Sequence, residues 1–193
     1  MRFKLFRFVP LLAVFCVGCV ICKTPVGDKV ARLNPQEWNG KWVGGDGGII
    51  WTKIKDAKLG IVELTAGQPF PKPRLTEEIL VRNLGPLLIG NQKAVGDQKA
   101  DNGYKFGRIS IDATHFVIFD ANESVFSNLV RRHELAGKLD RDKNGKPTGN
   151  GGCILERFSD KEYRRLKEQG FDLRSLFNED PDTVLVRYKW RLF

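Results

Sequence analysis

From Trp38 onward, short apolar stretches alternate with turns rich in Gly, Asp and Asn. This spacing is typical of an antiparallel β protein. The sequence predicts ten strands, at 40–44, 48–54, 60–65, 78–84, 87–91, 104–112, 115–120, 134–140, 153–158 and 184–192. Because exposed strand edges invite aggregation, we expect a mainly β domain whose antiparallel sheet is curled or closed like a barrel. The segment 68–74, which contains three prolines, is predicted to be a loop between two halves of the sheet.

Two short helices interrupt the predicted strands. Asn122 can cap the first, at 122–131, where apolar residues recur four positions apart. The second follows Ser159, which forms an S-x-x-E capping box with Glu162, and it ends before Gly170. This second helix is expected to be the longer one and to precede the last strand. Together these elements predict a single globular domain over residues 35–193.

The strand at 104–112 has an irregular alternation. Tyr104 and Phe106 are followed by Ile109 and Ile111, which fall on the opposite phase. Such a slip beside Gly107 predicts a β-bulge.

The first residues carry three basic side chains and no acidic one, and an uncharged apolar run follows at 8–22. A membrane-spanning helix needs about 20 apolar residues, so this run is short for a span. Pro10 would shorten any helix further. A basic start followed by a brief apolar stretch predicts a secretory signal.

Gly18 stands directly before Cys19 in this run. The arrangement resembles the lipobox of bacterial lipoproteins, with Val17 matching the pattern and Cys16 departing from it. The resemblance implies a signal peptide at 1–18, a lipid on Cys19 and a lipid-anchored tether at 19–34. An uncleaved anchor and ordinary secretion are the alternatives.

Three of the four cysteines cluster in the stretch FCVGCVIC. The spacing of Cys16, Cys19 and Cys22 matches half of a zinc ribbon, but no second half-site lies nearby. A metal site is therefore disfavoured. An oxidising compartment would permit a bond between Cys22 and Cys153, and a buried, inert Cys153 is the other outcome.

The chain carries a net charge of +9, which falls to +6 when the three basic residues of the signal leave. If the chain resides in the cell envelope, this excess of positive charge favours a partner that is another envelope protein, an anionic lipid or a cell-wall polymer. It does not favour nucleic acid. The charges are scattered, so an ordinary soluble surface explains them as well.

Gly40-Lys41-Trp42 forms a G-x-W at the first predicted strand. It resembles the opening of the lipocalins, whose tryptophan closes the barrel floor against a basic residue of the last strand. The resemblance makes Arg187 or Arg191 the partner of Trp42 and implies a carrier of a small apolar ligand. The candidate ligand-binding residues are Trp38, Trp42, Trp51, Arg187 and Arg191. Large core aromatics near a sheet edge explain the three tryptophans equally well.

The order of a lipobox, a W-x-G-x-W at 38–42, an LG-x-L-L-I at 84–89 and a Y-x-F-x-R-I at 104–109 also resembles small uncharacterised bacterial envelope lipoproteins. That resemblance covers most of residues 36–188 and implies the architecture and an envelope location, with the outer membrane favoured in a Gram-negative cell. It carries no activity.

Asp140, Asp142 and Asn144 read D-x-D-x-N-G, the opening of a calcium loop. The twelfth position, where a bidentate Glu belongs, is Gly151. A solvated hairpin loop explains the same residues, and no metal is expected.

Groups suited to catalysis are few. The chain has two histidines, His115 and His133, and Cys153 precedes a strand rather than a helix. We therefore expect no enzyme and no cofactor, and a hydrolase would need Cys153 or a serine beside one of the histidines. The sequence favours an interaction or structural lipoprotein of the envelope, with a lipocalin-like carrier as the alternative.

Overall fold

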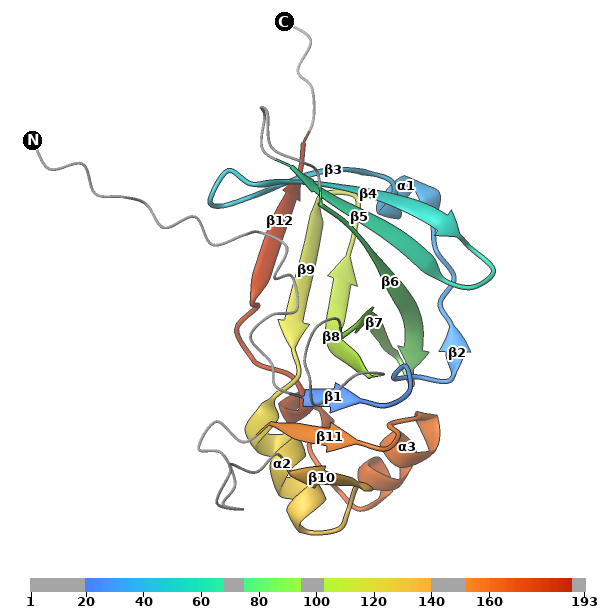
Figure 1. Cartoon of the computed structure of the whole chain (residues 1–193), viewed down its shortest axis with the longest axis vertical. Helices are drawn as coiled ribbons and strands as arrows, with labels where there is room; N and C mark the ends of the chain where they lie inside the picture. The colour runs from blue at the N-terminus through green and yellow to red at the C-terminus, as the bar shows by residue number, and fades with distance from the viewer. Residues whose placement is uncertain (1–19, 68–74, 95–102, 140–151, 189–193) are drawn as a thin grey trace, which may run out of the picture.

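The computed structural model describes residues 20–67, 75–94, 103–139 and 152–188. Eight of its antiparallel strands close into a barrel, in the order β3-β4-β5-β6-β7-β8-β9-β12 and back to β3 (Figure 1). The barrel strands are β3 (Gly40–Gly44), β4 (Ile49–Asp56), β5 (Ile61–Gly67), β6 (Leu75–Leu84), β7 (Leu87–Lys93), β8 (Tyr104–Ile111), β9 (His115–Asp120) and β12 (Thr183–Arg187). The predicted mainly β class with a closed sheet is confirmed. The predicted loop at 68–74 lies outside the described residues.

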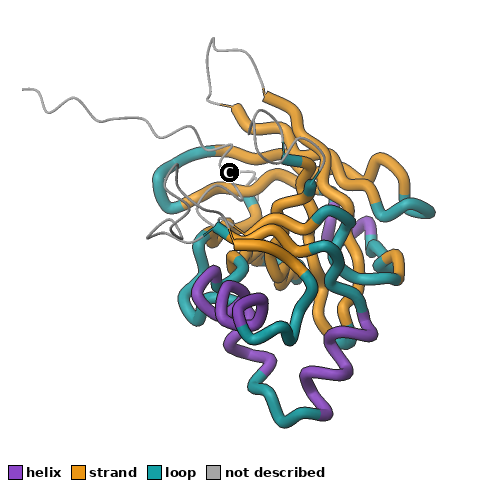
Figure 2. The backbone as a smooth tube through the Cα atoms, turned by 60° about the horizontal axis from the view of Figure 1, so that its bottom comes forward, coloured by secondary structure: helices purple, strands orange, loops and turns teal. Residues whose placement is uncertain are grey.

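A long insertion between β9 and β12 builds a second layer against one end of the barrel (Figure 1). Two of its strands join β1 in a small sheet, β10-β11-β1, which continues from the edge of β8. Figure 2 brings this end toward the viewer and shows the helices beside it. The elements of this layer are β1 (Val20–Cys22), α2 (Glu123–Arg131), β10 (Gly137–Leu139), β11 (Cys153–Leu155), α3 (Asp160–Glu168) and the 3-10 helix η1 (Leu173–Leu176).

Both helices begin where the sequence predicts. The Asn122 side chain accepts a hydrogen bond from the Val125 N–H (3.3 Å), and Ser159 and Glu162 form the expected capping box. The prediction that the second helix is the longer one is wrong, because α2 and α3 each span nine residues. The chain turns at Gly170, in the left-handed region at φ 76°, and continues into η1.

Strand β8 is buried on both faces, and this explains its irregular alternation. Phe106 packs outside the barrel against Phe126, with ring centroids 5.5 Å apart, in the core shared with the insertion. Ile109 packs inside the barrel. The pairing of β8 with β7 runs past Gly107, and its pairing with β9 reaches Gly107, both without a register shift, so the predicted bulge is absent. The apolar residues of β8 change face because the second layer covers the outside of this strand at Phe106.

The structure differs from the expected tether over residues 20–34. Val20 and Cys22 are 2% and 0% exposed in β1, and Val26 is fully buried in the same core. The segment then forms β2 (Lys29–Val30), which pairs with β6, and α1 (Pro35–Trp38). The sequence shows too little periodicity here because each of these elements is only two to four residues long. Cys19 lies outside the described residues.

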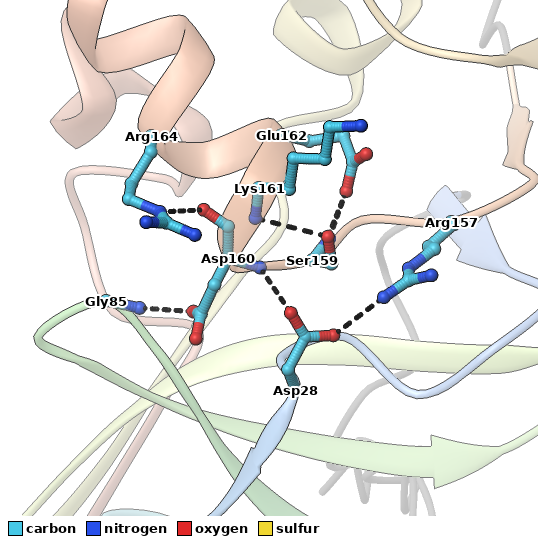
Figure 3. Close-up of polar contacts among 8 residues, drawn as sticks. All are labelled: Asp28, Gly85, Arg157, Ser159, Asp160, Lys161, Glu162 and Arg164. Atoms are coloured by element: carbon cyan, nitrogen blue, oxygen red, sulfur yellow. Dashed lines mark hydrogen bonds and ion pairs between the residues drawn. The ribbon is translucent and has the colours of Figure 1, made fainter.

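Side-chain hydrogen bonds fix this amino-terminal segment to the rest of the domain (Figure 3). Asp28 accepts hydrogen bonds from the Arg157 guanidinium (3.1 Å) and from the Asp160 backbone N–H (3.2 Å). The Asp160 carboxylate in turn accepts from the N–H of Gly85 (2.8 Å). Gly85 has a φ of 57°, and a Cβ at this position would lie 2.6 Å from the Tyr163 ring, so glycine is required here.

Candidate functional site

The barrel interior holds a packed aromatic cluster near α1. The rings of Trp38 and Trp42 lie 5.9 and 5.8 Å from that of Phe116. The buried side chains of this core are Ala31, Leu33, Trp38, Trp42, Ile50, Val62, Leu64, Ile79, Val81, Ile109, Phe116, Ile118 and Leu185. They come from α1, the segment before it and most of the barrel strands. Side chains rather than open space therefore occupy this part of the interior.

Arg187 closes the barrel over Trp42. Its guanidinium lies 4.6 Å from the centroid of the Trp42 ring, and the two residues are register partners on β12 and β3. The guanidinium also donates hydrogen bonds to the backbone carbonyls of Gln36 (2.8 Å) and Glu37, which belong to α1. One side chain therefore joins the last strand, the first barrel strand and the helix that covers the barrel end.

Gly40 makes room for this closure. A Cβ added at Gly40 would lie 3.2 Å from two atoms of the Arg187 guanidinium, which is tighter than most such contacts. The glycine of the G-x-W therefore lets the planar guanidinium approach the strand. The sequence predicted that Trp42 would contact Arg187 or Arg191, and the Trp42–Arg187 contact is confirmed. Arg191 lies outside the described residues.

Thr52 satisfies the polar atoms of the two buried tryptophans. The Trp42 indole N–H donates to the Thr52 hydroxyl (2.8 Å), and that hydroxyl donates to the backbone carbonyl of Trp38. Thr52 itself is 4% exposed. A buried polar group carries a large penalty when it lacks a partner, so this chain of hydrogen bonds fixes both rings in place.

Trp51 does not join the interior cluster. It lies on the outer face of β4, with the Lys41 ammonium 5.6 Å from its ring centroid. The same ammonium is 4.2 Å from the ring centroid of Tyr188. Of the four described candidates, the structure therefore brings Trp38, Trp42 and Arg187 together and places Trp51 in a separate group on the outside.

That outer group belongs to a larger apolar surface. Because side chains alternate along a strand, the neighbours of the interior residues on β9, β12, β3 and β4 point outward. We call this surface the β12 wall. Its residues are Lys41, Val43, Ile49, Trp51, His115, Val117, Val184, Val186 and Tyr188, all of them half-buried or exposed. The register brings Val184 opposite Val117, and Val186 opposite Val43.

Sequence reasoning missed the β12 wall, although one signal was present. Residues 183–188 read TVLVRY, in which Leu185 is buried while Val184, Val186 and Tyr188 are 44%, 49% and 41% exposed. A strand that is apolar on both faces must be covered on both or must leave one apolar face open. Here the outer face is open among the described residues.

The remaining predicted site residues do not assemble. Cys22 and Cys153 are fully buried on neighbouring strands, and no disulfide bond joins them. His115 and His133 are both exposed, at the start of β9 and after α2. The candidate calcium ligands Asp140, Asp142 and Asn144 lie outside the described residues. Within the ranges that the structure describes, no group of three or more His, Cys, Asp or Glu side chains could hold a metal ion.

Comparisons with protein-family models, with curated proteins and with solved structures find no match to this chain. None of the helices in the described part of the chain is both long and apolar enough to cross a bilayer.

Proposed function

We propose that this chain is an extracytoplasmic lipoprotein of the bacterial envelope that acts as an interaction module through the outside of its barrel. The observation that carries the proposal is where the apolar side chains lie. Trp38, Trp42 and Phe116 occupy the interior, whereas three of the five large apolar side chains that are exposed in the described part of the chain lie on and beside β12. A domain built this way offers a surface for a partner rather than a cavity for a cargo.

The anchor is the lipid on Cys19 that the lipobox implies. Acyl chains contribute about 0.8 kcal/mol for each CH₂ that they bury in the bilayer, so they hold a domain at the membrane without a spanning helix. The expected partners are the membrane itself, another envelope protein, an anionic lipid or a cell-wall polymer.

Metabolic labelling with a palmitate analogue tests the anchor. The full chain should incorporate the label and sediment with membranes. The Cys19→Ala variant should lose both properties, and the matched Cys22→Ala variant should keep both. Intact-mass analysis of the amino-terminal peptide locates the modification. Label retained by Cys19→Ala would contradict the proposal.

A carrier of a small apolar ligand is the second candidate. The observation that favours it is the closure of one barrel end by α1, Trp42 and Arg187, the arrangement that the lipocalin resemblance implies. Mass spectrometry of protein extracted from membranes separates the two functions. A stoichiometric bound lipid supports the carrier, and a stoichiometric co-purifying protein supports the interaction module.

A further inference from the structure

We propose that the β12 wall lies against the headgroup region of the bilayer, so that the anchored domain sits on its side rather than standing away from the membrane. This inference rests on the proposed lipid anchor at Cys19. In this orientation the bilayer interface is the partner that the β12 wall contacts.

The wall is continuous across four neighbouring strands. Val117 on β9 pairs with Val184 on β12, Val186 pairs with Val43 on β3, and Val43 pairs with Ile49 on β4. Such pairs place side chains on one face about 5 Å apart, so the apolar groups form one patch. The closed barrel leaves the backbone of these strands fully paired, and a partner can therefore be held only through side chains.

The residue types at the margin of the wall suit a membrane interface. Trp51 and Tyr188 flank the Lys41 ammonium, which lies 5.6 Å and 4.2 Å from their ring centroids. Tryptophan and tyrosine concentrate at the level of the lipid headgroups, where an apolar ring and a polar tip are both satisfied. Lysine places its stem on apolar surface and its charge in water at the same level.

The start of the described chain lies near the end of the barrel at which β12 and its wall begin. Strands β1 and β9 pair with the same edge of β8, β1 with residues 104–105 and β9 with residues 107–111. The beginning of β1 at Val20 therefore meets the end of β9 at Asp120, one strand away from β12 (Figure 1).

Because of this position, the anchored domain cannot move far from the bilayer surface. Val20 directly follows Cys19 and is 2% exposed, so no extended spacer separates the lipidated residue from the domain. A domain held this closely keeps one side at the bilayer. Val20 lies near the end of the barrel at which β12 begins, and the β12 wall extends from there toward Tyr188.

The charges around the wall indicate that apolar insertion, not attraction to anionic lipid, holds it there. Glu179, Asp180 and Asp182 are exposed in the turn before β12, and Asp112 is exposed in the turn before β9. They offset Lys41 and the exposed Lys53 on β4, although the chain as a whole is basic. We therefore expect the wall to bind vesicles of phosphatidylcholine alone.

An environment-sensitive fluorophore on a single introduced cysteine tests the orientation. Val184→Cys places the probe on the wall. Leu59→Cys places it at another exposed apolar position, in the turn between β4 and β5, which lies on the opposite side of the barrel in Figure 1. Cys22 and Cys153 are 0% exposed and do not compete for the reagent in the folded protein. The lipidated full chain carries either probe into phosphatidylcholine vesicles.

The Val184→Cys probe should shift its emission to the blue on vesicle binding and should become several-fold less accessible to aqueous iodide, while the Leu59→Cys probe should change in neither respect. If the two probes show the same emission shift and iodide accessibility on a chain whose lipidation is confirmed by mass, the proposed orientation is wrong but the lipid anchor is not contradicted. Absence of the lipid would overturn the anchor and, with it, this inference. A blue shift of the Val184→Cys probe at high protein concentration without vesicles would instead identify a second copy of the chain as the occupant, and would also overturn the inference.

Discussion

The Arg187 guanidinium lies 4.6 Å from the centre of the Trp42 ring and at the same time donates hydrogen bonds to two carbonyls of α1. The last barrel strand, the first barrel strand and the covering helix are held by one side chain. A cation over an indole face contributes about 0.5–2 kcal/mol, and hydrogen bonds from a charged donor contribute about 1.5–3 kcal/mol.

Arg187→Met should therefore destabilise the domain by about 3 kcal/mol in urea unfolding, because the apolar chain remains while the stacking and both hydrogen bonds are lost. Arg187→Lys should recover only part of this loss, since an ammonium cannot span two carbonyls as a planar fork does. Hydrogen exchange should accelerate first at 35–38 in both variants. Equal stability of the two variants would show that the fork has no role.

Thr52→Val changes shape little but removes the hydroxyl between the two buried tryptophans. The Trp42 indole N–H and the Trp38 carbonyl both lose their partner, so we expect a loss of about 1–3 kcal/mol in the free energy of unfolding. Thr76→Val, at an exposed threonine of β6, is the matched control and should stay within about 0.5 kcal/mol of the native chain. A similar effect of both substitutions would contradict the proposed role of the buried hydroxyl.

The barrel strands were predictable because each carries a local signal. Apolar alternation marks them, and turns such as Gly85 separate them. The G-x-W added one long-range pair, Trp42 with Arg187, which the structure confirms.

The second layer was less predictable, for two physical reasons. Its sheet is assembled from three-residue strands taken from residues 20–22, 137–139 and 153–155, and such short pieces carry no readable period. It also covers the outside of β8, so that strand is buried on both faces and its alternation resembles a bulge. The β12 wall could not be predicted, because an apolar strand face that is open to solvent contains the same residue types as one that is covered. Only the burial of each side chain in the structure distinguishes the two.

Asn91 tests whether residues 20–34 belong to the domain. Its side chain is 1% exposed, accepts from the Val26 N–H (2.6 Å) and donates to the carbonyls of Val26 (3.1 Å) and Leu80 (3.2 Å). Asn91→Ala should cost about 3 kcal/mol of unfolding free energy, because buried backbone groups of two segments lose their partner.

The same variant should expose residues 23–33 to trypsin before the rest of the chain. Asn128→Ala, at an exposed position of α2, is the control and should leave the cleavage pattern unchanged. Rapid cleavage within 23–33 in the unsubstituted protein would mean that this segment is a tether after all.

The turn between β8 and β9 should make stability depend on pH in the acid range. Asp112 accepts hydrogen bonds from the Thr114 hydroxyl (2.7 Å) and from the N–H groups of Thr114 (2.6 Å) and His115 (2.7 Å). The Thr114 hydroxyl and these N–H groups lower the pKa of Asp112 to about 2, against about 3.9 in an unfolded chain. The stabilising effect is therefore complete above the unfolded pKa and is lost as the pH falls through the folded one.

Asp112→Asn should be less stable than the native chain at pH 7, and the difference should shrink as the pH falls from about 4 toward about 2. Urea unfolding at a series of pH values measures it. Asp180→Asn, in the exposed turn before β12, serves as the control. A difference for Asp112→Asn that stays constant over the whole range would refute the assignment.

The two buried cysteines should be inert in the folded protein. Cys22 lies in β1 and Cys153 in β11, where Cys153 pairs with Val20, so the two thiols are two positions out of register. Burial raises the pKa of the Cys22 thiol, which keeps it protonated and unreactive.

Peptide mass spectrometry should find neither cysteine alkylated by iodoacetamide under native conditions, and both alkylated in denaturant without prior reduction. The Val184→Cys thiol, on the exposed face of β12, should react under native conditions and shows that the reagent is active. Native alkylation of Cys22 would show that β1 opens readily, and a requirement for reductant would show that the two cysteines are bonded.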